Sequence, residues 1–286
     1  MSHPVLNCAG KLLDLQKPKI MGILNTTPDS FSDGGNSYQQ GNLDLDLALQ
    51  RAGQMQKDGA SIIDVGGEST RPGAAKVSAQ EEMDRVVPVV ERIAKELDVI
   101  ISVDSSSAAL MKEAAAVGAG LINDVRALKR EGAAEMAAEL KLPVCLMHMQ
   151  GQPDSMQDKP QYDNVLSEVK AFLSARIDAC VAAGVDRAQI ILDPGFGFGK
   201  TLEHNVELLR QMSAFKAMGH PVLAGLSRKS MLQGLLGRSV GQRLAGSLGV
   251  AMLALQQGAA ILRVHDVAAS RDILELYWQI DAGHMQ

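Results

Sequence analysis

The chain has little of what marks a secreted or a membrane protein. Its 286 residues include only three cysteines, an odd number without paired spacing, so the sequence indicates no disulfide framework and favours a reducing cytoplasm. It has no run of about 18 apolar residues, and its N-terminus lacks a basic region followed by an apolar segment. We therefore expect neither a membrane span nor a secretory signal, and no membrane partner.

Charge and motif spacing exclude further classes. The net charge is −5 at pH 7, so nucleic acid is not an expected partner, and any bound anion must be held by a local basic cluster. Histidine and cysteine do not occur at zinc-site spacing, and no Ser-His-Asp or nucleophile-elbow pattern is present. The Gly-Lys-Thr at residues 199–201 is not a P-loop, because Pro194 stands where a P-loop needs glycine.

What the chain does contain is eight short apolar runs, nearly all of which end in a polar or charged residue. An amphipathic stretch rich in alanine and leucine follows each run, and this alternation predicts βα units with a parallel sheet. Eight such units in a chain of this length predict an α/β fold of the (β/α)8 TIM barrel type. The expected strands are residues 20–25, 61–67, 99–104, 121–124, 144–148, 190–193, 222–227 and 261–266.

The rest of the sequence fits one domain built around this barrel. Residues 5–8 and 11–15 predict a hairpin that would plug the barrel floor, so we assign 1–17 to the hairpin and 18–286 to the barrel. The expected helices are residues 43–57, 79–97, 108–117, 133–140, 165–183, 202–218, 242–257 and 268–280. Long polar loops, which in compact domains are usually functional or disordered, are expected at residues 26–41, 66–76 and 150–162. All three would rise from the catalytic face, which favours a mobile lid over disorder.

Cationic residues gather where the last two strands end. Barrel enzymes carry their chemistry at the ends of their strands, and phosphate is commonly bound at a helix N-terminus beside strands seven and eight. Arg263 and His265 point to the same side of the eighth strand, and Lys229 precedes the helix after the seventh. We predict an anion site from these three residues; the alternative is a solvated basic patch with one structural histidine.

Acceptor groups end three other strands, at Asp104, Asn123 and Asp193. Carboxylates and an amide that converge in a pocket suit the donor-rich edge of a heterocycle, such as an amidine or a guanine-like ring. Buried carboxylates are costly unless they are paired or hydrogen-bonded. The alternative, equally favoured by spacing, is a set of internal salt bridges across the barrel mouth.

Other strand ends and loops offer weaker candidates. Asn25, followed by Asp29 and Asp33, has the oxygen ligands that suit Mg²⁺, although the spacing by itself favours an Asx turn over a metal site. Phe196 and Phe198, on a glycine-rich loop, predict aromatic walls for a flat ligand.

Two residues of the fifth strand are more simply explained by structure. Cys145, inside an apolar strand, is expected to be a small buried hydrophobic residue. His148, which ends that strand, is expected to be structural rather than an acid or a base.

Several stretches of the chain resemble bacterial dihydropteroate synthases, in the family's order, from about residue 18 to residue 270. One departure is Thr26, where family members often have valine. The matching motifs are MGILNTTPDSFSDGG at 21–35, DVGGESTRPG at 64–73, IND at 122–124, DPGFGFGK at 193–200, SRKS at 227–230 and RVHD at 263–266.

The resemblance implies an enzyme of folate synthesis that joins 6-hydroxymethyl-7,8-dihydropterin diphosphate to 4-aminobenzoate, releases pyrophosphate and is the target of sulfonamides. It implies that the pterin ring contacts Asp104, Asn123, Asp193 and Lys229. It implies that Thr70, Pro72, Phe198 and Ser230 line the aminobenzoate pocket, with Arg71, Met147 and Gly225 as further substrate-binding residues. It also implies that the diphosphate is held by Arg263 and His265, that Mg²⁺ or pyrophosphate is contacted by Asn25, and that cationic charge at the pterin methylene is stabilised by Asp33. A homodimer is expected from the resemblance alone.

Two other interpretations of the sequence remain open. A pterin-binding methyltransferase would share the barrel but would not need a diphosphate site at Arg263 and His265, nor the loop at residues 70–72. A non-catalytic pterin- or nucleotide-binding barrel would lack the long glycine-rich loops.

Overall fold

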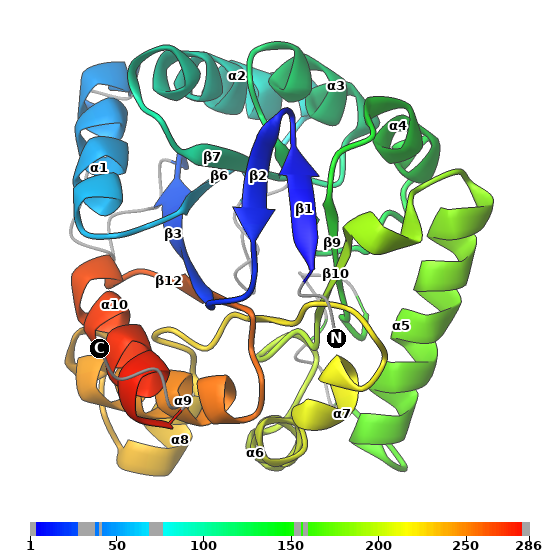
Figure 1. The fold of residues 1–286 in the computed structure, drawn as a ribbon, viewed down its shortest axis with the longest axis vertical. Helices are drawn as coiled ribbons and strands as arrows, with labels where there is room; N and C mark the ends of the chain where they lie inside the picture. Colours follow the sequence, from blue (N-terminus) through cyan, green and yellow to red (C-terminus); the bar gives the residue numbers. More distant parts are fainter. Residues whose placement is uncertain are drawn as a thin grey trace.

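The computed structural model describes residues 4–27, 38–39, 42–68, 77–151, 156 and 160–281. Its centre is an eight-stranded sheet in the order β10-β9-β8-β7-β6-β3-β12-β11, in which every neighbouring pair is parallel. A parallel bridge between Leu192 and Val222 joins the two ends of this order. The sheet therefore closes on itself, and the helices surround it as predicted for a TIM barrel (Figure 1).

The strands lie close to their predicted positions, but the seventh and eighth are shorter than expected. The seventh leaves the ladder after Ala224, and Arg228 then adopts a left-handed φ of 57°. The eighth ends at Val264, because the backbone N–H of His265 donates to the Ser227 hydroxyl instead of to a neighbouring strand. The barrel strands are β3 (Lys19–Asn25), β6 (Ile62–Gly66), β7 (Ile100–Asp104), β8 (Leu121–Asp124), β9 (Val144–Met147), β10 (Ile190–Asp193), β11 (Leu223–Ala224) and β12 (Ile261–Val264).

The helices follow the predicted pattern with one correction and one addition, α8 (Met231–Leu236), which was not among the expected helices. The single helix expected at 202–218 is two helices, because the chain turns after Gln211, and both Met212 and Phe215 are fully buried there. The helices are α1 (Leu45–Lys57), α2 (Ala79–Glu96), α3 (Ala108–Ala116), α4 (Ala133–Leu140), α5 (Val165–Ala182), α6 (Leu202–Arg210), α7 (Ser213–Lys216), α8 (Met231–Leu236), α9 (Leu244–Gln256) and α10 (Val267–Leu276). Short 3₁₀ turns occupy η2 (Arg187–Gln189) and η3 (Val240–Gln242), and a π-helical turn, η4 (Tyr277–Asp281), follows α10.

The predicted hairpin closes one end of the barrel. Strands β1 (Val5–Cys8) and β2 (Lys11–Asp14) pair antiparallel, and Figure 1 shows them lying across the barrel. Their buried side chains form one cluster with residues near the start of each barrel strand, such as Met21, Ile62 and Cys145. This confirms that the hairpin plugs the amino end of the barrel and that Cys145 is buried. A second antiparallel pair, β4 (Tyr38–Gln39) and β5 (Asn42–Leu43), precedes α1.

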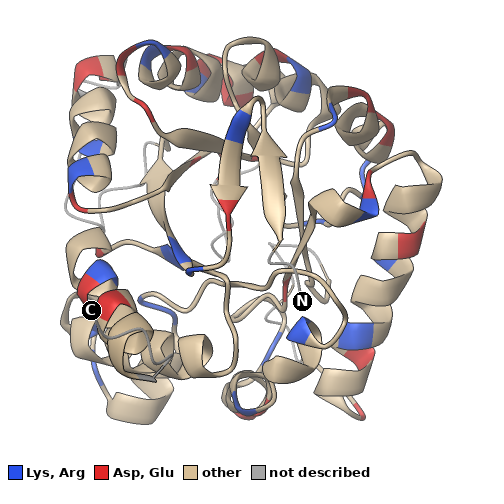
Figure 2. Ribbon diagram, in the orientation of Figure 1, with Lys and Arg blue, Asp and Glu red and all other residues tan. Residues whose placement is uncertain are grey.

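The larger hydrophobic core lies between the strands and the surrounding helices. Charged residues lie mostly on the outer helices, as expected for helices with one face on the core (Figure 2). Among the described helices, none combines the length and the apolar composition needed to cross a membrane. With the amino end closed by the hairpin, the open carboxyl end, which we call the barrel mouth, is the place for a site.

Candidate active site

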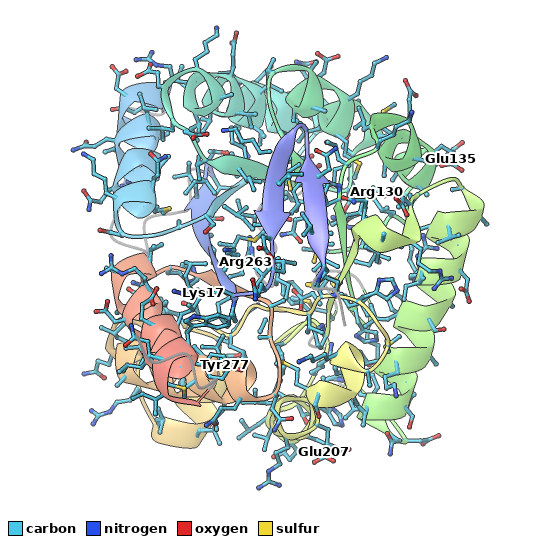
Figure 3. The ribbon with its side chains drawn as sticks, in the orientation of Figure 1. Lys17, Arg130, Glu135, Glu207, Arg263 and Tyr277 are labelled. Carbon is cyan, nitrogen blue, oxygen red and sulfur yellow. The ribbon has the colours of Figure 1, made fainter. Side chains whose placement is uncertain are left out.

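Arg263, on β12 and labelled in Figure 3, forms the centre of a polar network in the barrel mouth. Its Nε donates to Asp64 Oδ2 at 2.6 Å, and its Nη2 donates to Asp104 Oδ2 at 2.8 Å. Asp64 Oδ2 also accepts from Asn123 Nδ2 at 3.1 Å. Four residues from the strands β6, β7, β8 and β12 are thereby held in one arrangement.

This network brings together residues that the sequence assigned to two different tasks. Asp104 was expected to face a heterocycle and Arg263 a phosphate, but the two side chains are ion-paired with each other, which is the salt-bridge alternative. Burial raises the pKa of Asp104 above its usual range, and the Arg263 guanidinium opposes that rise. The cationic and acidic parts of the mouth are therefore contiguous rather than separate.

Asp64 is a member of this network that the sequence reasoning did not select. Its side chain is 0% exposed, and its Oδ1 has no hydrogen-bond partner among the described residues. The available signal was one charged residue within an otherwise apolar strand, next to Ile63 and Val65. A buried carboxylate of this kind needs a cationic partner, which Arg263 provides.

Asp193, at the end of β10, lies on the other side of the mouth. Burial raises the pKa of Asp193, while its Oδ1 accepts the Gly195 backbone N–H at 2.7 Å. Gly195 has a φ of +71°, and a Cβ there would lie 1.9 Å from the His148 carbonyl oxygen. Only glycine permits this turn, so it fixes the orientation of the Asp193 carboxylate.

Lys229 and Phe198 form a neighbouring pair in the mouth. The Lys229 Nζ lies 4.1 Å from the centroid of the Phe198 ring. Burial lowers the pKa of Lys229 to about 8; the Arg263 guanidinium acts in the same direction, and the Asp193 carboxylate opposes it. The predicted Lys229 thus lies against a flat aromatic surface, near enough to the Asp193 carboxylate to be affected by its charge.

The two phenylalanines of the glycine-rich loop do not share one role. Phe198 packs with Met147 and Val125 in an apolar cluster beside the mouth. Phe196 is 1% exposed and belongs to the main core, so the prediction that it forms a ligand wall is wrong. Gly197, which separates the two phenylalanines in the sequence, has a φ of +78°. The two rings pack into different hydrophobic clusters.

The ends of the seventh and eighth strands meet, as expected for a phosphate site. The Ser227 hydroxyl lies 3.0 Å from His265 Nδ1, and Arg228 is ion-paired with Asp266. A Cβ at Gly225 would lie 4.0 Å from Asp193 Oδ2, so this glycine borders the Asp193 carboxylate. Ser230 follows on the same loop and is exposed.

Lys200, from the Gly-Lys-Thr sequence that is not a P-loop, stabilises the loop beneath the site. Lys200 Nζ is buried, donates to the carbonyl oxygens of Gly195 at 2.9 Å and Phe198 at 3.0 Å, and lies 2.9 Å from His148 Nδ1. Burial lowers the pKa of Lys200 to about 7, and burial together with the Lys200 charge lowers the pKa of His148 to about 2. His148 is therefore a structural residue, as predicted.

We expect Lys200→Met to lower the free energy of unfolding by about 2–3 kcal/mol, since each buried carbonyl left without a partner costs roughly 1–3 kcal/mol. Urea unfolding measures the change. The matched control is Lys112→Met, on the exposed surface of α3, which should change stability by less than about 0.5 kcal/mol. Equal effects of the two substitutions would contradict the structural role of Lys200.

Of the remaining predicted site residues, four lie outside the described part of the chain and one, Asn25, lies within it. Asp33, Thr70, Arg71 and Pro72 lie outside the described residues. Asn25 is half-buried at the end of β3, paired in register with Gly66, which pairs in turn with Asp104. Asn25 therefore lies at the level of the polar network.

Comparisons with known proteins agree over almost the whole chain. A family model described as pterin binding enzyme matches residues 21–265. The dihydropteroate synthase of Haemophilus influenzae is 55% identical over 273 residues, which is 96% of this chain and 97% of that protein.

Solved structures give the same result. The dihydropteroate synthase of Yersinia pestis, in a sulfonamide drug complex, matches with a TM-score of 0.93 and 51% identity over 97% of this chain and 99% of that one. The dihydropteroate synthase of Xanthomonas albilineans in complex with 7,8-dihydropteroate matches with a TM-score of 0.87 and 44% identity over 98% and 99%.

Proposed function

Because this chain belongs to the dihydropteroate synthases among the pterin-binding enzymes, we propose that its barrel mouth joins 6-hydroxymethyl-7,8-dihydropterin diphosphate to 4-aminobenzoate and releases pyrophosphate. The observation that carries this function is 55% identity to a dihydropteroate synthase over nearly the full length of both chains. The methyltransferase and the non-catalytic barrel do not account for that identity.

The acceptors of the mouth suit the pterin ring. The ring edge presents N–H donors, and Asp193, Asp104 and Asn123 offer carboxylate and amide oxygens at the ends of neighbouring strands. We assign the ring to this edge, with Lys229 and the Phe198 ring beside it. The Gly195 N–H bond to Asp193 supports the assignment, because it orients the carboxylate before a ligand arrives.

The cations of the mouth suit the departing diphosphate. Two of the five N–H groups of the Arg263 guanidinium bind Asp64 and Asp104, and since no other acceptor is found for them in the described part of the chain, we assign the remaining N–H groups to a ligand. Lys229 and His265 add donors from the adjacent loop and strand end. Because Asp64 and Asp104 offset part of the Arg263 charge, we assign Arg263 both to the leaving group and to the positioning of Asp104.

We propose that Asn25 binds Mg²⁺ together with diphosphate oxygens. Among the described residues, no three His, Cys, Asp or Glu side chains are grouped so that they could hold a metal ion. The Asn25 side-chain oxygen, at the end of β3, together with diphosphate oxygens matches the way Mg²⁺ is commonly held, by one or two protein ligands plus substrate phosphates. When bound, the ion neutralises negative charge on the leaving group.

Positioning and electrostatics account for the chemistry. The bond between the pterin methylene and the diphosphate oxygen breaks, and the amine of 4-aminobenzoate forms the new C–N bond and loses a proton. Negative charge develops on the diphosphate, where Lys229, Arg263 and His265 stabilise it. We assign Asp33 to the positive charge on the methylene, and Thr70, Arg71, Pro72, Phe198 and Ser230 to the aminobenzoate.

A turnover assay tests the proposed function. The protein is mixed with Mg²⁺, the pterin diphosphate and radiolabelled 4-aminobenzoate, and dihydropteroate and pyrophosphate are measured. We expect both products in equal amounts, and none when the metal is removed by a chelator. Pterin binding without turnover would instead favour the non-catalytic barrel.

We expect kcat/KM to fall as the pH rises through about 8, because Lys229 stabilises negative charge only in its protonated form and burial lowers its pKa to about 8. Arginine stays protonated, so Lys229→Arg should retain its activity to a higher pH, even if the activity at neutral pH is reduced. The pH profile of both proteins is the measurement. A fall with the same midpoint in the variant would assign the titration to another group.

We also propose a cytoplasmic homodimer. Large hydrophobic side chains are about half exposed on α8, α9 and α10, at Leu236 (52%), Leu253 (50%) and Leu276 (50%), and such a surface is suited to a second copy of the chain. The three cysteines are free and buried, which is compatible with a reducing compartment. Sedimentation equilibrium tests the oligomeric state.

A further inference from the structure

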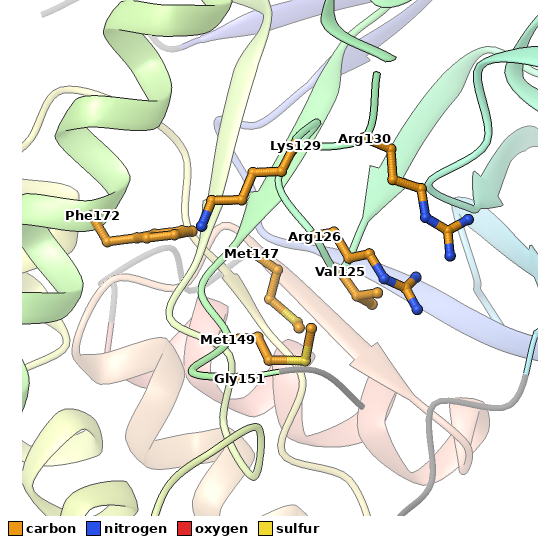
Figure 4. A pocket seen from close by; sticks show the side chains of 8 residues that line it. All are labelled: Val125, Arg126, Lys129, Arg130, Met147, Met149, Gly151 and Phe172. Carbon is orange, nitrogen blue, oxygen red and sulfur yellow. The ribbon is translucent and has the colours of Figure 1, made fainter. Parts of the chain in front are cut away.

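The residues assigned to the substrates have two kinds of support. At the ends of β8 and β9, the substrate site includes a cavity of about 270 Å³ whose lining contains Val125 and Met147 (Figure 4). Lys229, by contrast, lies on the loop between β11, which ends at Ala224, and α8, which begins at Met231. The chain has left the sheet there, so contacts with other elements must fix the position of Lys229.

Arg228, which precedes Lys229 in this loop, is held at both ends of its backbone and by its side chain. Its φ of 57° is left-handed, a conformation that residues other than glycine adopt only where the surroundings impose it. Its backbone N–H donates to the Ser247 hydroxyl at 2.9 Å, and its carbonyl oxygen accepts from Arg243 Nη1 at 2.9 Å. Its guanidinium is ion-paired with Asp266. The start of α9 and the end of the eighth strand together impose this conformation.

The conformation of Arg228 decides where its two neighbours point. On one side, the Ser227 hydroxyl lies 3.0 Å from His265 Nδ1 and accepts the His265 backbone N–H at 3.2 Å. On the other side, the Lys229 Nζ lies 4.1 Å from the centroid of the Phe198 ring. A change in the backbone angles of Arg228 would rotate one neighbour relative to the other, so both contacts depend on the left-handed turn.

Arg243, immediately before α9, connects this turn to the segment that follows it. Besides the Arg228 carbonyl oxygen, its guanidinium binds the Arg238 carbonyl oxygen at 3.1 Å and Gln233 Oε1 at 2.7 Å. Arg243 is 7% exposed, and within the described residues no carboxylate forms an ion pair with it. Three donors in one rigid plane are what arginine supplies and lysine does not. The side chain therefore fixes the turn by geometry rather than by pairing with an opposite charge.

We propose that Arg243 is a positioning residue for the reaction, which acts through Arg228 to direct Lys229 toward the diphosphate. Because Arg243 is buried and bound to three acceptors, it acts through the turn and not by touching a substrate. This inference rests on the proposed function, in which Lys229 stabilises the departing diphosphate. Loss of Arg243 should therefore weaken binding of the diphosphate more than binding of the pterin ring.

The variant Arg243→Met tests this difference. Calorimetry measures the affinity for 6-hydroxymethyl-7,8-dihydropterin diphosphate and for 6-hydroxymethyl-7,8-dihydropterin, which lacks the diphosphate. We expect the affinity for the diphosphate to fall at least tenfold and the affinity for the alcohol to change less than threefold. Ser247→Ala, which removes only the acceptor of the Arg228 N–H, should show the same preference and serves as the second variant if Arg243→Met does not fold.

A destabilised protein with an intact turn is the matched control. Phe215→Leu shortens a fully buried side chain of α7 in the main core and should lower the midpoint of urea unfolding. We expect its affinities for both pterins to stay within twofold of those of the unaltered protein. A selective loss of diphosphate affinity in Phe215→Leu would show that lower stability alone produces the effect, and would overturn the proposal.

Glycine at position 228 tests whether Arg243 acts through the turn. Glycine adopts a positive φ about as readily as a negative one, so it needs less support from Arg243. We expect Arg243→Met to weaken diphosphate binding less than threefold when it is introduced into the Arg228→Gly protein. An effect as large as in the unaltered background would show that Arg243 does not act through Arg228, and would overturn the proposal.

Two further outcomes separate this inference from the proposed function. Equal losses of affinity for the two pterins in Arg243→Met, in a protein that still turns over, would overturn the inference alone. Equal affinity of the unaltered protein for the two pterins, without turnover, would overturn the proposed function, and the role of Arg243 with it.

Discussion

Replacing Arg263 with methionine is expected to lower the free energy of unfolding by about 3–5 kcal/mol, because the loss of one partner from a buried ion pair leaves the other charge uncompensated. Here two carboxylates lose their partner, and one of them, Asp64, is fully buried. We also expect kcat/KM to fall by at least about 100-fold, since donors to the departing diphosphate are lost. Urea unfolding and steady-state kinetics measure the two effects.

The stability loss in this variant should depend on pH. Burial already raises the pKa of Asp104, and without the guanidinium that pKa rises further. At pH values between the usual aspartate pKa of about 4 and the raised pKa of Asp104, the folded variant binds more protons than the unfolded chain. Its free energy of unfolding therefore falls as the pH rises through this range. Because Asp104 of the unaltered protein has a pKa raised to about 8, both proteins lose stability in parallel below that pH, and the deficit should widen above about pH 8, where only the variant still keeps this proton.

A double variant separates folding from catalysis. Arg263→Met/Asp64→Asn removes the buried charge together with its partner, so part of the stability should return while activity stays low. If the double variant regained activity along with stability, Arg263 would be a structural residue only, and its assignment to the diphosphate would be wrong.

Asp193→Asn should weaken binding of the pterin diphosphate by about 100-fold or more. Hydrogen bonds to charged groups contribute roughly 1.5–3 kcal/mol each, and the loss of two such bonds corresponds to at least about two powers of ten. An amide also presents its own N–H groups to a ring edge that consists of donors. Calorimetric titration measures the dissociation constant.

Asp193→Asn should still fold, because the substitution removes a buried charge and can keep the oxygen that accepts the Gly195 N–H. Asp163→Asn is the matched control, since Asp163 is exposed and far along the chain from the strand ends. An unchanged pterin affinity in Asp193→Asn, with the control also unchanged, would remove Asp193 from the pterin site.

Local pattern was enough to predict the barrel and most of its strand ends. Apolar runs that alternate with amphipathic stretches specify βα units, because each βα unit must bury its apolar faces against its neighbours. Asp104, Asn123 and Asp193 could be selected for the same reason, since each interrupts or ends an apolar run. The motif resemblance then added an activity that spacing alone did not supply.

Side-chain partners could not be predicted in this way. Phe196 and Phe198 are two residues apart, yet one lies in the main core and the other beside the mouth. Lys200 has the surroundings of a nucleotide motif in the sequence, but it donates to carbonyl groups of its own loop. In each case the turn geometry decides which side of the loop a side chain occupies.

The sequence by itself therefore determined the barrel, the end of it that carries the site, and most of the polar residues found there, Asp64 excepted, because these depend on contacts within one βα unit or between neighbouring ones. Only the tertiary structure decided that Arg263 binds Asp64 and Asp104, from which it is separated by 199 and 159 positions. The reason is physical: these partners come within hydrogen-bond distance only when the strands close into a barrel, and burial then makes their pairing obligatory.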